Sequence, residues 1–243
     1  MFEYKGNAIQ SDFLQEIFTT VPPHYDLINH LVTWGRDRRW RRMAARECLV
    51  SQPDRILDLC CGTGDLAVTF ARLAGSDTEV VGVDHSGPML RIAALKAERV
   101  CDRLKVSFVL GDIANIPFPD ASFDCIGISF ALRNLTYKNS LAARYIAEVL
   151  RVLNRDGRFV IVETSQPESR LIKKLYHLYM RSFVFGLGLL ISGNRIAYYY
   201  LANSATNYYT PEELKKILVK AGFRQVSFRR LLMGAVSIVI AVK

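Results

Sequence analysis

The most informative stretch of the chain is RILDLCCGTGD, residues 55–65. A hydrophobic run ends in an acid and leads into a glycine-rich turn, which is the pattern of a strand followed by a helix. Glycine allows a sharp turn and the close approach of a ligand, because it has no Cβ. The spacing Gly62-x-Gly64-x-x-Ala67 also fits the fingerprint of a dinucleotide site. The stretch predicts a Rossmann-like α/β fold with a ligand at this turn.

The charges around the turn separate two classes of ligand. A pyrophosphate prefers a helix N-terminus that is free of negative charge. Asp58 and Asp65 flank this turn and would repel a pyrophosphate. A sulfonium compound with a free ammonium group would be attracted to both carboxylates. We therefore expect a sulfonium cofactor with a free ammonium group rather than a dinucleotide.

Two further acids follow predicted strands. The run VVGVD ends in Asp84, about 20 residues past the turn, where a carboxylate can accept hydrogen bonds from ribose hydroxyls. The run VLGD ends in Asp112, which could accept a hydrogen bond from the adenine amino group. A single Asp after a strand is often only an N-cap. Three successive strands that end in Asp favour a cofactor site.

From Pro53 onward, β-branched apolar runs alternate with helical patterns, which predicts a mostly parallel sheet covered by helices. We expect strands at residues 55–59, 79–84, 106–111, 123–129, 158–163, 225–231 and 236–242. A long helix is expected over residues 168–190, and another from Thr210 to Gly222. We expect one domain over residues 1–243: a helical lid or packing layer (1–52), a cofactor-binding core (53–163), and a helical insertion with the last two strands (164–243).

Composition narrows the class of protein. The chain has 243 residues and a net charge of +9, which favours an anionic partner, either nucleic acid or an acidic membrane. The arginines within residues 36–42 form one basic block, which we expect to be a solvated helix face or a contact for lipid headgroups. The N-terminus has no pattern of a secretory leader, and the longest apolar run, 183–192, is shorter than a membrane span. Five cysteines without a CxxC pair predict a reduced, metal-free cytoplasmic protein.

The region after the fourth predicted strand argues against methylation of a nucleobase. Enzymes that methylate base amino groups usually carry Asp/Asn-Pro-Pro-aromatic there, whereas this chain has ISFALRN at residues 128–134. The sequence VPPHY at residues 21–25 precedes the first strand and lacks the leading acid or amide. We therefore expect no nucleic-acid partner. An RNA or protein acceptor remains the alternative, favoured only by the net charge.

Several segments resemble class I S-adenosylmethionine methyltransferases and, more closely, the UbiE family of ubiquinone/menaquinone-biosynthesis C-methyltransferases. They are YDLIN (25–29), WGRDRRW (34–40), FALRN (130–134), RVL (151–153), GRFVIVETS (157–165) and YLANS (200–204). The chain departs from this family at residues 154–156, where Asn-Arg-Asp replaces Lys-Pro-Gly. It also has Asp37 where members often have His, which leaves open any role for a histidine at that point.

The resemblance implies a Rossmann-like class I methyltransferase fold, with a seven-stranded sheet and an antiparallel last strand. It implies methyl transfer from S-adenosylmethionine to a ring carbon of a polyprenylated quinol, either demethylmenaquinol or a demethylated benzoquinol. No metal is implied, and an oligomer is left open. The cofactor-binding residues from the wider fold pattern are Asp58, Gly62 and Gly64. Those carried over from the family are Thr63, Asp84, Asp112, Ile113 and Ser129.

A ring carbon becomes a good nucleophile only when a neighbouring phenol loses its proton, so the reduced quinol is the expected acceptor. Arg133 follows the fourth strand and could stabilise a phenolate, and Asn134 could orient the ring hydroxyls or cap a turn. Tyr25, Asp26 and Asn29 would reach the acceptor from the lid or serve as structural anchors. We take these five as the catalytic candidates.

An apolar segment follows the fifth predicted strand. Three outcomes are open for it: a tunnel for the isoprenoid tail, a contact with a bilayer at the inner face of the membrane, or ordinary core packing. The residues concerned are Leu171, Leu175, Leu178, Tyr179, Phe183 and 185–190.

Overall fold

The sheet of this protein has seven strands in the order β3-β2-β1-β4-β5-β7-β6. The structure is a computed structural model that describes residues 22–99 and 105–243, with side chains from Asp26 onward. Strands β1 to β5 are parallel, and β7 runs antiparallel to β5 and β6. This confirms the predicted sheet and its antiparallel last strand. The strands are β1 (Arg55–Leu59), β2 (Glu79–Asp84), β3 (Val106–Leu110), β4 (Phe123–Ser129), β5 (Leu153–Thr164), β6 (Gln225–Leu231) and β7 (Val236–Val242).

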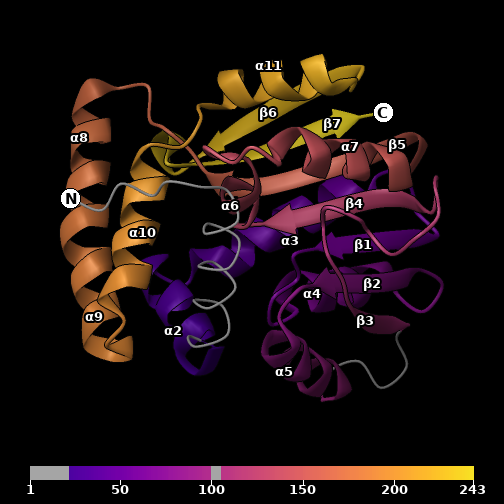
Figure 1. The fold of residues 1–243 in the computed structure, drawn as a ribbon, viewed down its shortest axis with the longest axis horizontal. Helices are drawn as coiled ribbons and strands as arrows, with labels where there is room; N and C mark the ends of the chain where they lie inside the picture. The colour runs from indigo at the N-terminus through magenta and orange to yellow at the C-terminus, as the bar shows by residue number, and fades with distance from the viewer. Residues whose placement is uncertain (1–21, 100–104) are drawn as a thin grey trace.

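Helices cover both faces of the sheet (Figure 1). On one face α3 packs against α4 and β5, and on the other α7 and α11 pack against each other and the sheet. Thr210 and Glu213 form a capping box at the start of α11, as the predicted N-cap requires. The helices bounding the core are α3 (Arg36–Leu49), α4 (Asp65–Ala74), α5 (Gly87–Glu98), the short α6 (Leu132–Thr136), α7 (Ala142–Val152) and α11 (Pro211–Ala221).

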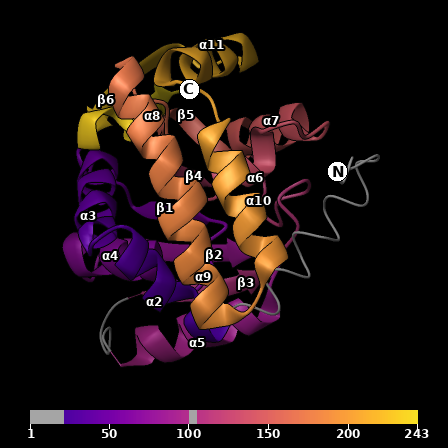
Figure 2. The same cartoon turned by 90° about the vertical axis from the view of Figure 1, so that its left-hand side faces the viewer.

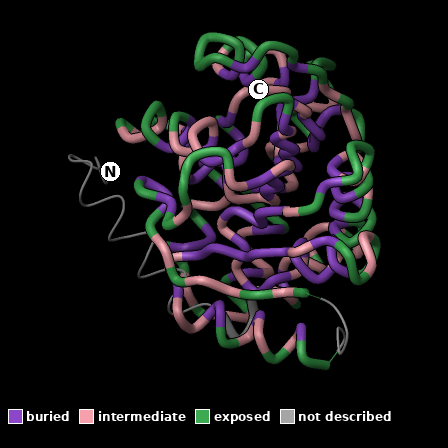
Figure 3. Tube along the Cα trace, turned by 90° about the vertical axis from the view of Figure 1, so that its right-hand side faces the viewer, coloured by how far each residue is buried: buried purple, intermediate pink, exposed green. Residues whose placement is uncertain are grey.

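The hydrophobic core lies in two layers, one on each face of the sheet. Alternate residues of the same strand enter different layers: Leu57 joins the α7–α11 side, and Ile56 joins the α3–α4 side. Strands covered on both faces are expected to be mainly apolar, and β1, β2 and β4 are buried along most of their length. Buried stretches accordingly gather in the middle of the molecule, and exposed stretches lie around its rim (Figure 3). This rigid centre fixes the strand ends that carry the site.

The N-terminal region divides into two parts. Helix α3 is a packing layer, because Trp40, Ala44, Ala45 and Cys48 are buried against the sheet. Helix α2 (Pro22–Val32) instead lies beside α9 and near the carboxyl ends of the strands (Figure 1).

A helical hairpin follows β5. Helix α8 (Arg170–Tyr179), the π-helical turn η1 (Met180–Val184) and α9 (Phe185–Ser192) form one continuous helix, and α10 (Arg195–Thr206) returns beside it (Figure 2). The chain reverses at Gly193, whose φ is +69°, and the Asn194 side chain caps α10. The continuous helix has 23 residues and is long and apolar enough, by length and composition alone, to cross a membrane. The long helix predicted over residues 168–190 is thus confirmed, whereas the apolar run 183–192 alone underestimated the length of the apolar helix.

The prediction that the cysteines are reduced is wrong for one pair. Cys48 of α3 and Cys125 of β4 form a disulfide with a Cα–Cα distance of 5.8 Å. The two residues lie 77 positions apart, so no local spacing in the sequence signals the pair. Cys60 and Cys61 are free thiols.

Candidate active site

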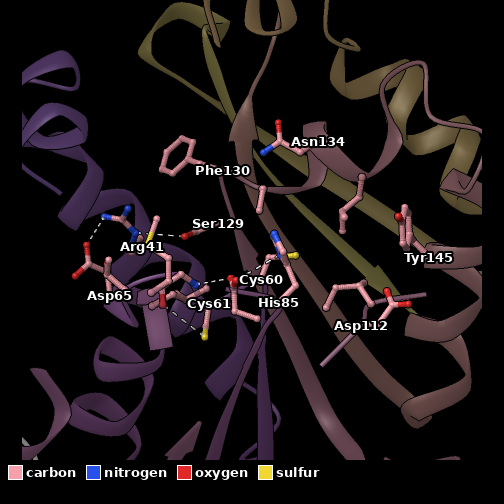
Figure 4. Close-up of a pocket in the computed structure, with 18 of the residues that line it drawn as sticks. Arg41, Cys60, Cys61, Asp65, His85, Asp112, Ser129, Phe130, Asn134 and Tyr145 are labelled. Carbon is pink, nitrogen blue, oxygen red and sulfur yellow. Dashed lines mark hydrogen bonds and ion pairs between the residues drawn. The ribbon is translucent and has the colours of Figure 1, made fainter. Parts of the chain in front are cut away.

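A cavity of about 170 Å³ lies at the carboxyl ends of β1, β2 and β4 (Figure 4). The turn after β1 forms one wall, with Gly62 at φ +54° and Gly64 at φ +77°, a region that side chains rarely adopt. A Cβ at Gly62 would meet nothing within 4 Å, so this glycine leaves open space beside the cavity. A Cβ at Gly64 would lie 2.9 Å from Cβ of Ala93, so close packing also requires glycine there. The turn is therefore built for a ligand that approaches the backbone.

Asp84 lies at the end of β2 and lines this cavity. The backbone N–H of Gly62 donates to its Oδ2 at 2.8 Å, and the N–H of Ser86 donates to its Oδ1 at 2.9 Å. Each carboxylate oxygen is thereby held in place and keeps a further lone pair. The carboxylate can accept hydrogen bonds from a pair of ligand hydroxyls.

Asp112, Ile113 and Ser129 also line the cavity, as does Thr63. Oδ1 of Asp112 accepts the N–H of Ala114 at 2.8 Å, which fixes the short turn after β3. Tyr145 of α7 borders the same end of the cavity (Figure 4). The structure thus brings together predicted residues from the carboxyl ends of four strands, β1 to β4.

Asp58 is placed differently from this group. Its carboxylate is buried beneath the turn and accepts the N–H of Ala67 at 2.8 Å, near the start of α4. Burial raises the pKa of Asp58 to about 8, against the opposing effects of the Ala67 hydrogen bond and Arg41. Asp58 therefore supports the turn from below and is not among the described residues that line the cavity.

Asp26, a catalytic candidate, reaches the cofactor turn. Its Oδ1 accepts a hydrogen bond from Oγ1 of Thr63 at 2.6 Å, and Nζ of Lys96 donates to its Oδ2 at 2.9 Å. Lys96 also pairs with Asp65. Helix α2 is thereby fastened to the turn and to α5, beside the cofactor cavity rather than at the acceptor side.

A second cavity of about 170 Å³ lies next to the first and is mainly apolar. Its walls come from α3, η1 and α10 and from the segments after β4 and β5. Arg41, Phe130 and Asn134 line both cavities. The two cavities therefore meet at these three residues.

Arg133 lines the second cavity and is almost fully buried. Its Nη1 donates to Oε1 of Glu163 at 3.0 Å and to Oγ1 of Thr164 at 3.1 Å, and its Nε donates to Oγ of Ser204 at 3.0 Å. Burial alone would lower the pKa of Arg133, but the Glu163 carboxylate and the surrounding tyrosines Tyr200, Tyr176 and Tyr208 together outweigh it, so the pKa is raised. Arg133 thus remains a fixed cation, and Nη2 makes none of these hydrogen bonds.

Asn134 and Asn29 also border the second cavity. Oδ1 of Asn134 accepts the hydroxyl of Tyr200 at 3.3 Å, so its orientation is set by α10. Asn29 lies on α2 opposite these residues. The side chain of Tyr25, the remaining catalytic candidate, lies outside the described residues.

Arg41 was missed as a site residue. The sequence predicts a solvated helix face or a contact with lipid headgroups for it, but its side chain is buried and lies beside Asp65 and Ser129 at the first cavity (Figure 4). It donates to Oδ2 of Asp37 at 2.6 Å and to Oγ of Ser129 at 3.3 Å, and lies 3.4 Å from Oδ2 of Asp65. Its guanidinium also lies 5.7 Å from the ring centre of Phe130, a non-glycine residue at φ +56°. Strain of this kind is typical of functional sites.

The fold and its paired cavities define the class I methyltransferase architecture. A solved S-adenosylmethionine-dependent methyltransferase of Aquifex aeolicus covers 82% of this chain and 88% of its own, with a TM-score of 0.56 and 18% identity. The 1,6-didemethyltoxoflavin-N1-methyltransferase of Burkholderia thailandensis, solved with its substrate and S-adenosylhomocysteine, covers 100% of this chain and 92% of its own. Its TM-score is 0.65 at 19% identity. These likenesses confirm the fold.

Sequence similarity identifies the family. The profile of the ubiE/COQ5 methyltransferase family matches residues 6–243, and the chain belongs to that family. The demethylmenaquinone methyltransferase of Deinococcus radiodurans is 38% identical over 95% of this chain and 90% of its own. The ubiquinone/menaquinone biosynthesis C-methyltransferase UbiE of Pseudomonas fluorescens is 35% identical over 98% of this chain and 91% of its own. The protein is therefore an enzyme of the methyltransferase class, as the sequence motifs predicted.

Proposed function

We propose that this enzyme transfers the methyl group of S-adenosylmethionine to a ring carbon of a polyprenylated quinol. The observation that carries the proposal is that a cavity lined by several carboxylates meets a mainly apolar cavity at Arg41, Phe130 and Asn134. A charged cofactor and an apolar aromatic acceptor require two such environments in contact. The relatives from Deinococcus and Pseudomonas, which bear names of menaquinone and ubiquinone methylation, support the same chemistry.

The residues of the first cavity fit S-adenosylmethionine. Asp84 would hold the ribose hydroxyls, and Asp112 with Ile113 would border the adenine. The open space at Gly62, with Asp58 and Asp65 nearby, suits the positively charged methionine part. When bound, the cofactor supplies an electrophilic methyl group.

The residues of the second cavity would prepare the acceptor. Its apolar walls exclude water from the ring, which strengthens every charge interaction within. Arg133 is held by Glu163 and Ser204, so its charge needs no reorganisation to stabilise a phenolate, directly or through a water molecule. Asn134, oriented by Tyr200, would align a ring hydroxyl. A ring carbon beside that phenolate is then nucleophilic enough to accept the methyl group.

The proposal is tested with reduced demethylmenaquinol and reduced demethylated benzoquinol as acceptors for labelled S-adenosylmethionine. We expect label in at least one reduced quinol and none in the oxidised quinones, and the preferred ring identifies the pathway. Equilibrium dialysis of the cofactor runs alongside as a control for an intact site. A protein that binds the cofactor and labels neither quinol would overturn the proposed acceptor.

A further inference from the structure

The outer face of the α8–η1–α9 helix is an exposed apolar stripe. Leu171, Leu175 and Leu178 recur at a helical spacing and are 67%, 57% and 63% exposed, and Leu190 is 85% exposed. The inner face of the same helix is occupied: Met180 and Val184 are buried against α10. The leucines therefore line no tunnel and belong to no core. An exposed apolar face of this length indicates an interaction surface.

The charge around this stripe has one sign. Between Glu168 and Glu212 the sequence contains no Asp or Glu, yet it contains Arg170, Lys173, Lys174, Arg181 and Arg195. Lys174, Arg181 and Arg195 are exposed. Apolar side chains flanked by cations match the surface of a bilayer with anionic headgroups.

Trp34 extends the surface from the corner between α2 and α3. Its side chain is 70% exposed, its ring stacks on Phe183 at 6.1 Å, and its Nε1 donates to the hydroxyl of Tyr179 at 3.2 Å. Beside it runs a shallow groove lined by His30, Leu31, Trp34, Gly35, Phe183 and Leu187. An exposed tryptophan beside an apolar groove is typical of the headgroup level of a membrane.

The stripe and the second cavity are opposite faces of one helix. Tyr176, Tyr179, Met180 and Val184 line the cavity, whereas the leucines of α8 point outward. The exposed stripe therefore lies on the side of the helix that faces away from the proposed acceptor cavity.

We propose that the outer face of residues 170–192, together with Trp34, docks on an anionic lipid bilayer and lies in its interface. The helix does not cross the bilayer, because its inner face packs on α10 and its outer face carries Lys174 and Arg181. Docking would place the acceptor cavity beside the membrane that holds the quinol. That last consequence rests on the proposed function, but the docking itself does not.

The first experiment measures flotation of the full chain with phosphatidylcholine vesicles that contain or lack phosphatidylglycerol. We expect binding to the anionic vesicles and, at low salt, about tenfold weaker binding to the neutral ones. Leu171→Ser/Leu175→Ser/Leu178→Ser should weaken binding by about tenfold or more, because these exposed side chains lose their apolar contact with lipid. Lys174→Gln/Arg181→Gln should weaken binding and reduce its salt dependence.

Matched controls lie on other surfaces. Leu95→Ser on α5 removes an exposed leucine, and Lys215→Gln/Lys220→Gln on α11 removes two exposed cations. Neither change should alter vesicle binding. Brominated lipid should quench Trp34, while a Trp34→Phe variant, which retains only the buried Trp40, should not be quenched.

Several outcomes would overturn the docking proposal. The first is that the protein does not bind anionic vesicles, and the second is that the α11 control loses as much vesicle binding as the leucine variant. The third is that light scattering detects a dimer of the native protein and a monomer of the triple leucine variant. The last outcome would assign the face to a second copy of the chain. Turnover of a quinol with a truncated tail should be unchanged in the leucine variant. Vesicle binding without turnover of any quinol would refute the proposed function and leave the docking intact.

Discussion

Arg133 is a buried cation beside an apolar cavity, and its environment explains how it keeps its charge there. Glu163 is buried with it, and both Nη1 and the backbone N–H of Arg133 donate to that carboxylate. A buried pair of this kind contributes little net stability, but the loss of one partner is costly. The pair with Glu163 therefore serves to hold the positive charge of Arg133 beside the second cavity.

We predict that Arg133→Lys lowers kcat at least about 100-fold, since one preorganised donor near developing charge is worth roughly 10²–10³ in rate. Lysine keeps the charge but not the planar set of donors that Glu163, Thr164 and Ser204 engage. The Kd for S-adenosylmethionine should stay unchanged, because Arg133 does not line the cofactor cavity. Initial-rate assays give kcat and titration of the cofactor gives Kd. The surface substitution Arg224→Lys serves as control and should change neither value. An equal loss of cofactor affinity would contradict the assignment.

Asp58 predicts a pH dependence of cofactor binding. Burial raises its folded pKa to about 8, above the ordinary 3.8 of an aspartic acid, so the folded protein holds a proton that the unfolded chain loses. By linkage, Asp58 makes the free energy of unfolding fall as the pH rises from about 4 to about 8. A cationic ligand above the turn favours the carboxylate and releases that proton.

The Kd for S-adenosylmethionine should therefore decrease between pH 6 and 8 and level off above. Calorimetry in buffers of different ionisation enthalpy should detect the released proton. Asp58→Asn should abolish both effects, whereas Asp77→Asn, an exposed acid, should abolish neither. A pH-independent Kd in the native protein would refute this role of Asp58.

Arg41 is a buried site residue that was not predicted from the sequence. Within residues 36–42 five arginines look alike, and composition favours solvent for all of them. The stripe of Trp40, Ala44, Ala45 and Cys48 does signal which face of α3 is buried. Arg41 lies on that stripe, so helical periodicity could have found it. Its partner Asp65 was predicted at the turn for a different reason.

At the scale of the elements, α2 is held over the cofactor turn by few contacts. Asp26 bonds to Thr63 and Lys96, and Lys96 bridges to Asp65. Asp26, Lys96 and Asp65 are only partly buried, so each of these ion pairs is individually weak. Weak ion pairs let α2 separate from the turn more easily than a fully buried contact would.

We predict that Lys96→Met raises the dissociation rate of S-adenosylmethionine about fivefold to tenfold, because α2 loses its bridge to α5. Asp26→Ala should act in the same direction. The exposed Lys105 offers a matched control, and Lys105→Met should leave the rate unchanged. Stopped-flow displacement of the cofactor gives the rates. If Lys96→Met instead changed kcat alone, α2 would act on the acceptor and would not control the release of the cofactor.

The strands and their terminal acids were predictable, because apolar runs and Asp58, Asp84 and Asp112 are local signals. Helix α10 was not predicted, since its YYYLANSA sequence has no strong amphipathic period. The π-helical turn at 180–184 and the disulfide also escaped prediction. These features arise from packing between segments that are distant in sequence.

At the scale of the whole molecule, the site exists only because remote segments converge. The second cavity combines Asn29 of α2, Arg133 after β4 and Tyr198 of α10, which lie more than 100 residues apart at the extremes. Sequence motifs identified Asn29 and Arg133 individually, but not the apolar cavity between them. The chemistry proposed here therefore rests on the tertiary structure.

The central claim is that the methyl group reaches a ring carbon of a reduced quinol. The most direct test uses S-adenosylmethionine with a ¹³C-labelled methyl group, reduced demethylmenaquinol and the demethylated benzoquinol, followed by NMR of the extracted product. We predict a ¹³C signal at the shift of a methyl group on a ring carbon, absent with oxidised quinone and formed about 100-fold more slowly with Arg133→Lys. A methoxy signal, or none while the cofactor is bound, would contradict the claim.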